Sequence, residues 1–165
     1  MSFASAGPHS FASDGFNGCT GVVIASERGA IIGHYFSNPN GVNTAKSQLP
    51  ALIQQNAAAL NPGGQAYVYA QVDYKYQGQF DAAGVKDQLV QLLQANGFNP
   101  IITTYIEPLA IFVDADGDVI DNIDMDNAQY GSLIVSNAGG GSSPTDVRFI
   151  SITVQEDLLM GHPSA

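Results

Sequence analysis

The chain has 165 residues, of which 45% are hydrophobic and 12% are charged, so it is long enough to bury the core of one domain. Fifteen acidic residues against five basic ones give a net charge of −10, which argues against binding to nucleic acid and to an anionic membrane surface. The single cysteine excludes an internal disulfide and zinc sites built from several thiolates. No apolar run approaches the roughly 20 residues of a membrane span.

The segment Met1–Gly18 is rich in Ser, Ala, Gly and Phe, has no Lys or Arg, and has no long apolar stretch. It therefore does not have the pattern of a signal peptide, and the chain has no disulfides. We expect a protein that is cytoplasmic or is released without a recognisable signal. We also expect a single domain over residues 1–165, with peripheral tails at 1–12 and 157–165.

The first half of the chain predicts a β-hairpin followed by a helix. Two β-type runs, Cys19–Ala25 and Ala30–Phe36, flank the turn Ser26–Gly29. Turn-forming residues follow at Ser37–Asn43. Apolar residues at helical spacing then predict a helix from about Ala45 to Ala59, with Pro50 in its first turn.

The second half predicts one more helix and several strands. Asp81 is the expected N-cap of this helix and Gly97 its C-terminal stop. Glycines 139–141 fit no phosphate-binding loop, and we expect a flexible loop there, or a lid. The predicted strands are Ala66–Tyr74, Pro100–Ile106, Leu109–Val113, Asp118–Ile123, Ser132–Ser136 and Asp146–Val154.

This order of elements lacks a strict alternation of strands and helices. We therefore expect an α+β fold with a two-sheet, sandwich-like core, mixed or antiparallel, and two or more helices packed outside.

Cys19 and His34 are the residues that most clearly suggest chemistry. In a hairpin with an even-numbered loop, Ala25 pairs with Ala30 and Gly21 pairs with His34, so Cys19 and His34 share one face as diagonal neighbours. We expect Gly21 to leave room for the imidazole. A neighbouring imidazole stabilises the thiolate, which is the nucleophilic form of cysteine.

The stretch Asn17-Gly18-Cys19-Thr20, the apolar strand after it and the strand that ends in Gly33-His34 resemble the Cys–His protein glutamine deamidases. This family includes the chemoreceptor deamidase CheD and the catalytic domains of cytotoxic necrotizing factor-type toxins. In several members a Thr six residues before the Cys orients the His, and Ser13 has that position here. Asn17 stands where the family usually has Ser. The resemblance implies a sandwich-like fold, a toxin-like activity and hydrolysis of a glutamine side chain in a protein substrate.

The residues themselves are compatible with such a reaction. The Cys19 thiolate attacks an amide carbon, His34 protonates the departing ammonia, and water activated by His34 hydrolyses the thioester. We expect the backbone N–H of Cys19 to stabilise the oxyanion. Ser13, Asp14, Asn17 or a backbone carbonyl then fixes the His34 tautomer.

Two alternatives stay open. The first is a non-catalytic protein-binding module that keeps the fold and binds a basic partner through its acidic surface. The second is a cysteine peptidase or acyltransferase with the same dyad. A thiolate paired with His34 would be alkylated well below the reference thiol pKa of about 8.5, whereas an inert thiol favours the binding module.

Other polar residues predict no further site, and no cofactor or metal is expected. The run Asp114–Asp126 lacks the glycine and glutamate spacing of a calcium-binding EF-hand loop, so we expect a hairpin turn with solvated acids. His9 and His162 have no metal-ligand spacing. Tyr67 and Tyr69 predict one face of a half-buried strand, and Tyr74 and Tyr76 share a face as well.

Overall fold

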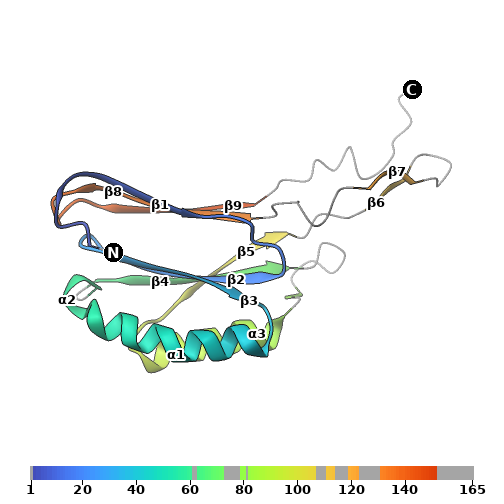
Figure 1. The fold of residues 1–165 in the computed structure, drawn as a ribbon, viewed down its shortest axis with the longest axis horizontal. Helices are drawn as coiled ribbons and strands as arrows, with labels where there is room; N and C mark the ends of the chain where they lie inside the picture. The colour runs from blue at the N-terminus through green and yellow to red at the C-terminus, as the bar shows by residue number, and fades with distance from the viewer. Residues whose placement is uncertain are drawn as a thin grey trace.

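The structure is a computed structural model that describes residues 2–60, 63–72, 79–80, 82–106, 111–113, 119–122 and 131–151. A three-stranded sheet, a four-stranded sheet and a layer of helices are stacked in that order (Figure 1). This is the α+β class with a two-sheet core and outer helices, as the order of elements predicts.

The three-stranded sheet is antiparallel and has the order β1-β8-β9, with β1 at Ala6–Ser13, β8 at Gly131–Gly139 and β9 at Thr145–Ser151. Residues 1–12 are not the expected peripheral tail, because β1 is a paired strand and Phe3 is fully buried. Small residues and a proline on the outer face of β1 give this segment its tail-like composition. Its other face is half-buried, with His9, Phe11 and Ser13 directed inward.

The four-stranded sheet is mixed and has the order β3-β2-β4-β5. The predicted hairpin of β2 (Cys19–Ala25) and β3 (Ala30–Phe36) is confirmed. Strand β4 (Gln65–Val72) pairs antiparallel with β2, and β5 (Ile101–Ile106) pairs parallel with β4.

Helix α1 spans Pro39–Gln55 and the short α2 spans Ala57–Leu60, so α1 begins six residues earlier than the sequence analysis expected. Asn38 is the N-cap of α1, and its side chain accepts a hydrogen bond of 3.0 Å from the N–H of Gly41. An Asn followed by Pro at the first helical position has the composition of a turn, which explains the late predicted start. Pro50 consequently lies inside the helix and not in its first turn.

Helix α3 spans Ala83–Ala95, and its N-cap is Ala82, without a capping side chain, rather than the expected Asp81. Asp81 itself lies outside the described residues. Gly97 follows the C-cap Asn96 with φ of +86°, which agrees with its expected role as the stop.

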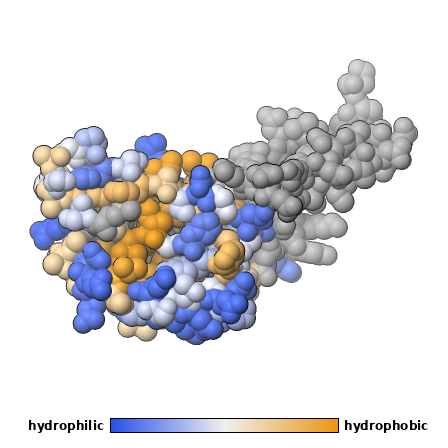
Figure 2. Space-filling view, in the orientation of Figure 1, coloured by the Kyte–Doolittle hydropathy of each residue, from blue (hydrophilic) through white to orange (hydrophobic). Residues whose placement is uncertain are grey.

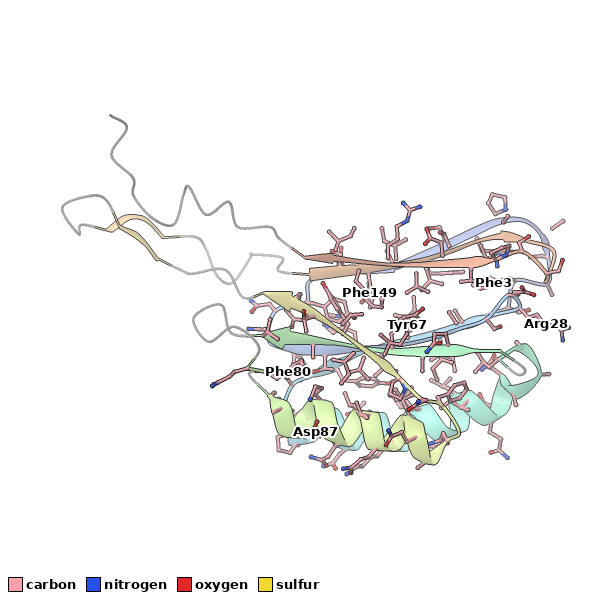
Figure 3. All side chains as sticks on the ribbon, turned by 180° about the vertical axis from the view of Figure 1, so that it is seen from behind. Phe3, Arg28, Tyr67, Phe80, Asp87 and Phe149 are labelled. Carbon is pink, nitrogen blue, oxygen red and sulfur yellow. The ribbon has the colours of Figure 1, made fainter. Side chains whose placement is uncertain are left out.

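Two apolar layers hold the elements together. The first lies between the four-stranded sheet and the helices, and it takes the even-numbered residues of β2, such as Val22 and Ile24, with Leu49 and Leu89. The second lies between the two sheets. Figure 3 shows Tyr67 and Phe149 in this layer, where their ring centroids are 5.3 Å apart. Its fully buried large side chains are Phe3, Phe16, Tyr69, Tyr105 and Leu133.

The expected hairpin beyond Pro108 is present as an antiparallel pair of β6 (Ile111–Val113) and β7 (Val119–Asn122). The predicted turn 114–117 and most of the acidic run that ends at Asp126 lie outside the described residues. Elsewhere in the described chain, no cluster of three or more His, Cys, Asp or Glu side chains could hold a metal ion.

The glycine-rich turn between β8 and β9 is held in place rather than being the expected flexible loop. The Asn137 side chain donates to the carbonyl of Ser143 at 2.7 Å and accepts from the N–H of Gly139 at 2.6 Å. Gly140 and Gly141 donate to the carbonyls of Ser5 and Phe3. In the β1–β8 register Gly139 pairs with Ala6, far from Ser13, so this turn does not act as a lid over the Ser13 end of the strand.

Among the helices that the structure describes, none is both long and apolar enough to cross a membrane.

Candidate active site

A cavity of about 460 Å³ opens where β1 ends and β2 begins. Its volume is within the range of small-molecule binding sites. The cavity is lined by Cys19 from β2, by His34 and Phe36 from β3, and by Gly15 and Asn17 from the connection that crosses between the sheets.

The register of the hairpin places Cys19 and His34 on one face, as predicted. Gly21 lies opposite His34 and Cys19 lies opposite Phe36. The odd-numbered residues of β2 pack in the layer between the sheets, and Cys19 belongs to that layer. The structure therefore brings the thiol and the imidazole to the same cavity as diagonal neighbours.

Ser13, the third predicted site residue, contacts His34 from the other sheet. Its hydroxyl oxygen lies 3.2 Å from Nδ1 of His34. If the hydroxyl accepts a hydrogen bond from Nδ1–H, the imidazole is held in the tautomer whose Nε2 has the free lone pair. Ser13 is at the end of β1, opposite Leu133 of β8, so its position depends on the pairing of an N-terminal segment that the sequence suggests is a tail.

Phe16 is a site residue that the sequence analysis missed. Its fully buried ring stacks on the imidazole of His34, with a centroid separation of 4.1 Å and an interplanar angle of 13°. A Cβ at Gly21 would lie only 2.9 Å from Cε1 of Phe16. Gly21 thus leaves room for the Phe16 ring beneath the imidazole and not for the imidazole itself. The sequence feature that could have indicated such a ring is the glycine opposite His34 in an apolar strand, because a glycine there leaves room for a bulky neighbour on that face.

The backbone of Cys19 is held by Tyr105. The N–H of Cys19 donates to the Tyr105 hydroxyl at 3.1 Å, and that hydroxyl lies 2.6 Å from the Cys19 carbonyl. The expectation that the Cys19 N–H stabilises an oxyanion in the cavity is therefore wrong for this structure. The adjacent N–H of Gly18 donates to Oε1 of Gln71 at 2.7 Å, so it is occupied as well. These two hydrogen-bond partners could not be predicted from the sequence, because Tyr105 in β5 and Gln71 in β4 are far from Cys19 along the chain.

Burial is the main cause of the pKa shifts of the Cys19 thiol and the His34 imidazole. The side chain of Cys19 is 5% exposed, and burial raises the pKa of its thiol, although a hydrogen bond from the Asn17 backbone opposes this rise. Partial burial lowers the pKa of His34, and the negative charge of Asp14 opposes this fall. At neutral pH the site therefore holds a thiol beside a neutral imidazole, and the expected resting thiolate is corrected.

The remaining candidates do not join the site. His9 lies in the middle of β1, four residues before Ser13, and its ring contacts the Ser5 hydroxyl at 3.1 Å and packs against Phe3. Tyr67 and Tyr69 share the face of β4 that meets the other sheet, in agreement with a half-buried strand. His162, Tyr74 and Tyr76 lie outside the described residues.

Comparison of the chain with protein-family models, with curated proteins and with solved structures finds no match.

Proposed function

We propose that the protein is a cysteine-dependent amidohydrolase that deamidates a glutamine side chain of a protein substrate, with Cys19 as nucleophile and His34 as acid and base. The observation that carries this proposal is the meeting of three chain segments at one cavity. Ser13 contacts Nδ1 of His34 at 3.2 Å, and Cys19 lies on the same face of the hairpin. A thiol, a base and a group that orients the base form the arrangement required for nucleophilic catalysis.

The protonation of the site favours activation by a general base. Because the pKa of Cys19 is raised and that of His34 is lowered, a neutral imidazole is available to take the thiol proton as Sγ attacks. Attack forms the bond from Sγ to the amide carbon and moves the carbonyl π electrons to oxygen. The imidazolium then gives its proton to the departing ammonia as the carbon–nitrogen bond breaks. Water attacks the resulting thioester while His34 takes its proton, and the products are a glutamate side chain and the free thiol.

The donor that stabilises the oxyanion must come from groups other than the N–H of Cys19 and Gly18, which Tyr105 and Gln71 occupy. Asn17 is our candidate, because it lines the cavity next to Cys19 and its side chain is exposed. Its carboxamide N–H₂ is a suitable donor to a developing negative charge.

A protein substrate with a basic surface fits the charge of the chain. The net charge of −10 attracts a positively charged partner and speeds its association at low salt. The resemblance to the Cys–His deamidases supports glutamine as the residue attacked. The same dyad would also suit a peptidase or acyltransferase, which would cleave the backbone or transfer the acyl group instead of releasing ammonia alone.

A specific observation favours the second candidate, a non-catalytic module that binds protein. Cys19 is nearly buried, and its backbone N–H is bonded to Tyr105 rather than directed at the cavity. Both features fit a structural cysteine beneath a ligand cavity.

The test is incubation of the protein with an unfolded, lysine-rich polypeptide that contains glutamine, followed by ammonia measurement and intact-protein mass spectrometry. The proposal expects a gain of about 1 Da per glutamine converted, an intact substrate backbone, and loss of both signals in Cys19→Ser and His34→Ala, since the two residues act as a unit. Ser13→Ala should reduce the rate less, and Ser10→Ala, on the outer face of the same strand, is its matched control. Equal mass gains with wild type and Cys19→Ser would remove the dyad from the reaction. Absence of any gain would favour the binding module.

A further inference from the structure

Phe36 is the most exposed of the large apolar side chains whose exposure the structure describes, at 69%. It lies opposite Cys19 in the hairpin, and it lines the cavity together with the thiol and the imidazole of His34. Figure 2 shows exposed hydrophobic residues among hydrophilic ones on the face where Figure 1 draws β3. The Phe36 ring therefore forms an open aromatic wall of the candidate active site.

The backbone of Phe36 is fixed, so the exposure of its ring is not that of a frayed strand end. The N–H of Ser37 donates to the carbonyl of Gly18 at 3.1 Å and closes the ladder between β2 and β3. The carbonyl of Phe36 accepts from the N–H of Asn38 at 2.8 Å. Gly41, in the first turn of α1, lies so near that a Cβ added there would collide with this carbonyl. The start of α1 thus holds Phe36 in place beside the cavity.

The register of the hairpin places the Phe36 ring next to the proposed nucleophile. Because the next pair, Gly18 and Ser37, is hydrogen-bonded, Cys19 and Phe36 form a non-hydrogen-bonded pair, in which the Cβ atoms are about 4.5–5.5 Å apart. A substrate residue two positions from the target is about 6.8 Å from it along an extended chain. A long side chain within two residues of the target can therefore reach the face of the ring.

Asp14 gives this cavity a negative charge. It is exposed and directly precedes Gly15, which lines the cavity. Its charge acts on the imidazole of His34, where it opposes the fall in pKa that burial causes. Neither ion pair between residues that the structure describes includes Asp14, so no basic side chain in that part of the chain neutralises its carboxylate.

The cavity lacks a cation from the described part of the chain. The four basic side chains described there, which do not line the cavity, are Arg28, Lys46, Lys86 and Arg148. An exposed aromatic face attracts a cation through the negative potential of its π electrons, and a nearby carboxylate adds to this attraction. The net charge of −10 disfavours an anionic group at the same place.

We propose that Phe36 and Asp14 form a subsite for a positively charged side chain of the substrate, a lysine or arginine within two residues of the target glutamine. The cationic group contacts the face of the Phe36 ring, and the carboxylate of Asp14 attracts it. The identity of the target as glutamine rests on the proposed function, whereas the preference for a cation can be measured without turnover. The subsite restricts the general attraction between an acidic protein and a basic partner to one position beside the cavity.

The experiment measures binding of short capped peptides to the Cys19→Ser variant, which cannot turn them over, by NMR titration. Each peptide has a central glutamine in a neutral background of Gly, Ser and Thr, with a single lysine one or two residues before or after it. Its matched control has norleucine, an uncharged side chain of similar length, in place of the lysine. We expect at least one lysine peptide to bind about fivefold more tightly than its control, because an exposed cation–π contact and an exposed ion pair each contribute modestly.

Variants of the protein assign this preference to the two residues. Added to Cys19→Ser, Phe36→Leu keeps an apolar side chain but removes the aromatic face, and Asp14→Asn removes the charge at almost constant size. Each should reduce the preference for lysine to about twofold or less. Glu27→Gln, in the turn at the other end of the hairpin, removes the same net charge and should leave the preference unchanged. Phe36 and Asp14 are exposed, so circular dichroism should stay unchanged in both variants.

The subsite is rejected if no peptide binds at millimolar concentration, or if norleucine peptides bind as tightly as lysine peptides at every position. It is also rejected if Phe36→Leu keeps the full preference, or if Glu27→Gln lowers it as much as Asp14→Asn does, because net charge then explains the binding. A lysine preference without ammonia release from the same peptides by wild type would keep the subsite and reject the deamidase. Ammonia release with equal kcat/KM for lysine and norleucine peptides would keep the deamidase and reject the subsite.

Discussion

The hydroxyl of Tyr105 lies 2.6 Å from the carbonyl oxygen of Cys19 and accepts the N–H of the same residue, although the two are 86 positions apart in the chain. It also lies 3.2 Å from Oε1 of Gln71, which in turn accepts the N–H of Gly18. The start of β2 is therefore fixed by side chains from β4 and β5. This bonding fixes the backbone of Cys19, which is one of the residues that line the cavity.

The first prediction concerns the two hydrogen bonds between the Tyr105 hydroxyl and the backbone of Cys19. Tyr105→Phe removes the hydroxyl and leaves buried backbone groups of Cys19 without their partner, which should lower the free energy of unfolding by about 1–3 kcal/mol. Urea denaturation followed by circular dichroism measures the change. Tyr67→Phe, on the same sheet face, is the matched control and should change stability little, because Tyr67 is only half-buried. Equal effects of the two substitutions would show that the hydrogen bonds of the Tyr105 hydroxyl do not stabilise the fold.

A second prediction uses the contact between Phe16 and Gly21. In Gly21→Ala the new Cβ would meet Cε1 of Phe16 at 2.9 Å, and the ring has no free space because it stacks on His34. We expect a loss of about 1–3 kcal/mol in the free energy of unfolding, and a changed His34 environment in NMR spectra.

Gly84→Ala is the control for this substitution. Gly84 lies in α3, and a methyl group added there would have nothing within 4 Å, so alanine should stabilise the protein by about 0.5–1 kcal/mol. If Gly21→Ala were as stable as Gly84→Ala, the contact between Phe16 and Gly21 would not restrict the position of the ring.

The hairpin and its face were predictable because they depend on local rules. An even-numbered loop fixes the parity of the β2–β3 pairing, so Gly21 opposite His34 follows from the sequence alone. The helical periodicity that marks α3 is equally local. What was missed depends on distant parts of the chain. The inward positions of β1 are His9, Phe11 and Ser13, which form no apolar alternation, and the strand's pairing partner β8 is more than a hundred residues away.

The protonation states of Cys19 and His34 could not be predicted from the sequence for the same reason. The sequence places a thiol next to an imidazole, which suggests an ion pair. In the structure, the Phe16 ring covers the imidazole of His34, and the Tyr105 hydroxyl bonds the backbone of Cys19. These residues come from segments that only the folded chain brings together. Desolvation raises the pKa of Cys19 and lowers that of His34, so both groups are neutral at pH 7.

A third prediction concerns the titration of His34. Its pKa is lowered by burial, while Asp14 partly restores it, so Asp14→Asn should lower the pKa further. NMR titration of the ring protons measures this shift, and Asp87→Asn, on α3, is the control. Because the folded-state pKa lies below the unfolded value of about 6.5, the contribution of His34 to stability is present above that pH and is lost as pH falls. A rise in the His34 pKa after Asp14→Asn would contradict the assigned role of Asp14.

The last prediction separates a general-base mechanism from a resting ion pair. Because burial raises the pKa of Cys19 and leaves its side chain 5% exposed, iodoacetamide should alkylate the native protein more slowly at pH 7 than it alkylates the same protein in urea. His34→Ala should leave this slow rate nearly unchanged, since no imidazolium stabilises a thiolate in the free protein. In the deamidation assay the same substitution should remove nearly all turnover. Rapid alkylation of the native protein at pH 6, lost in His34→Ala, would instead establish a thiolate–imidazolium pair and reject the mechanism proposed for the neutral site.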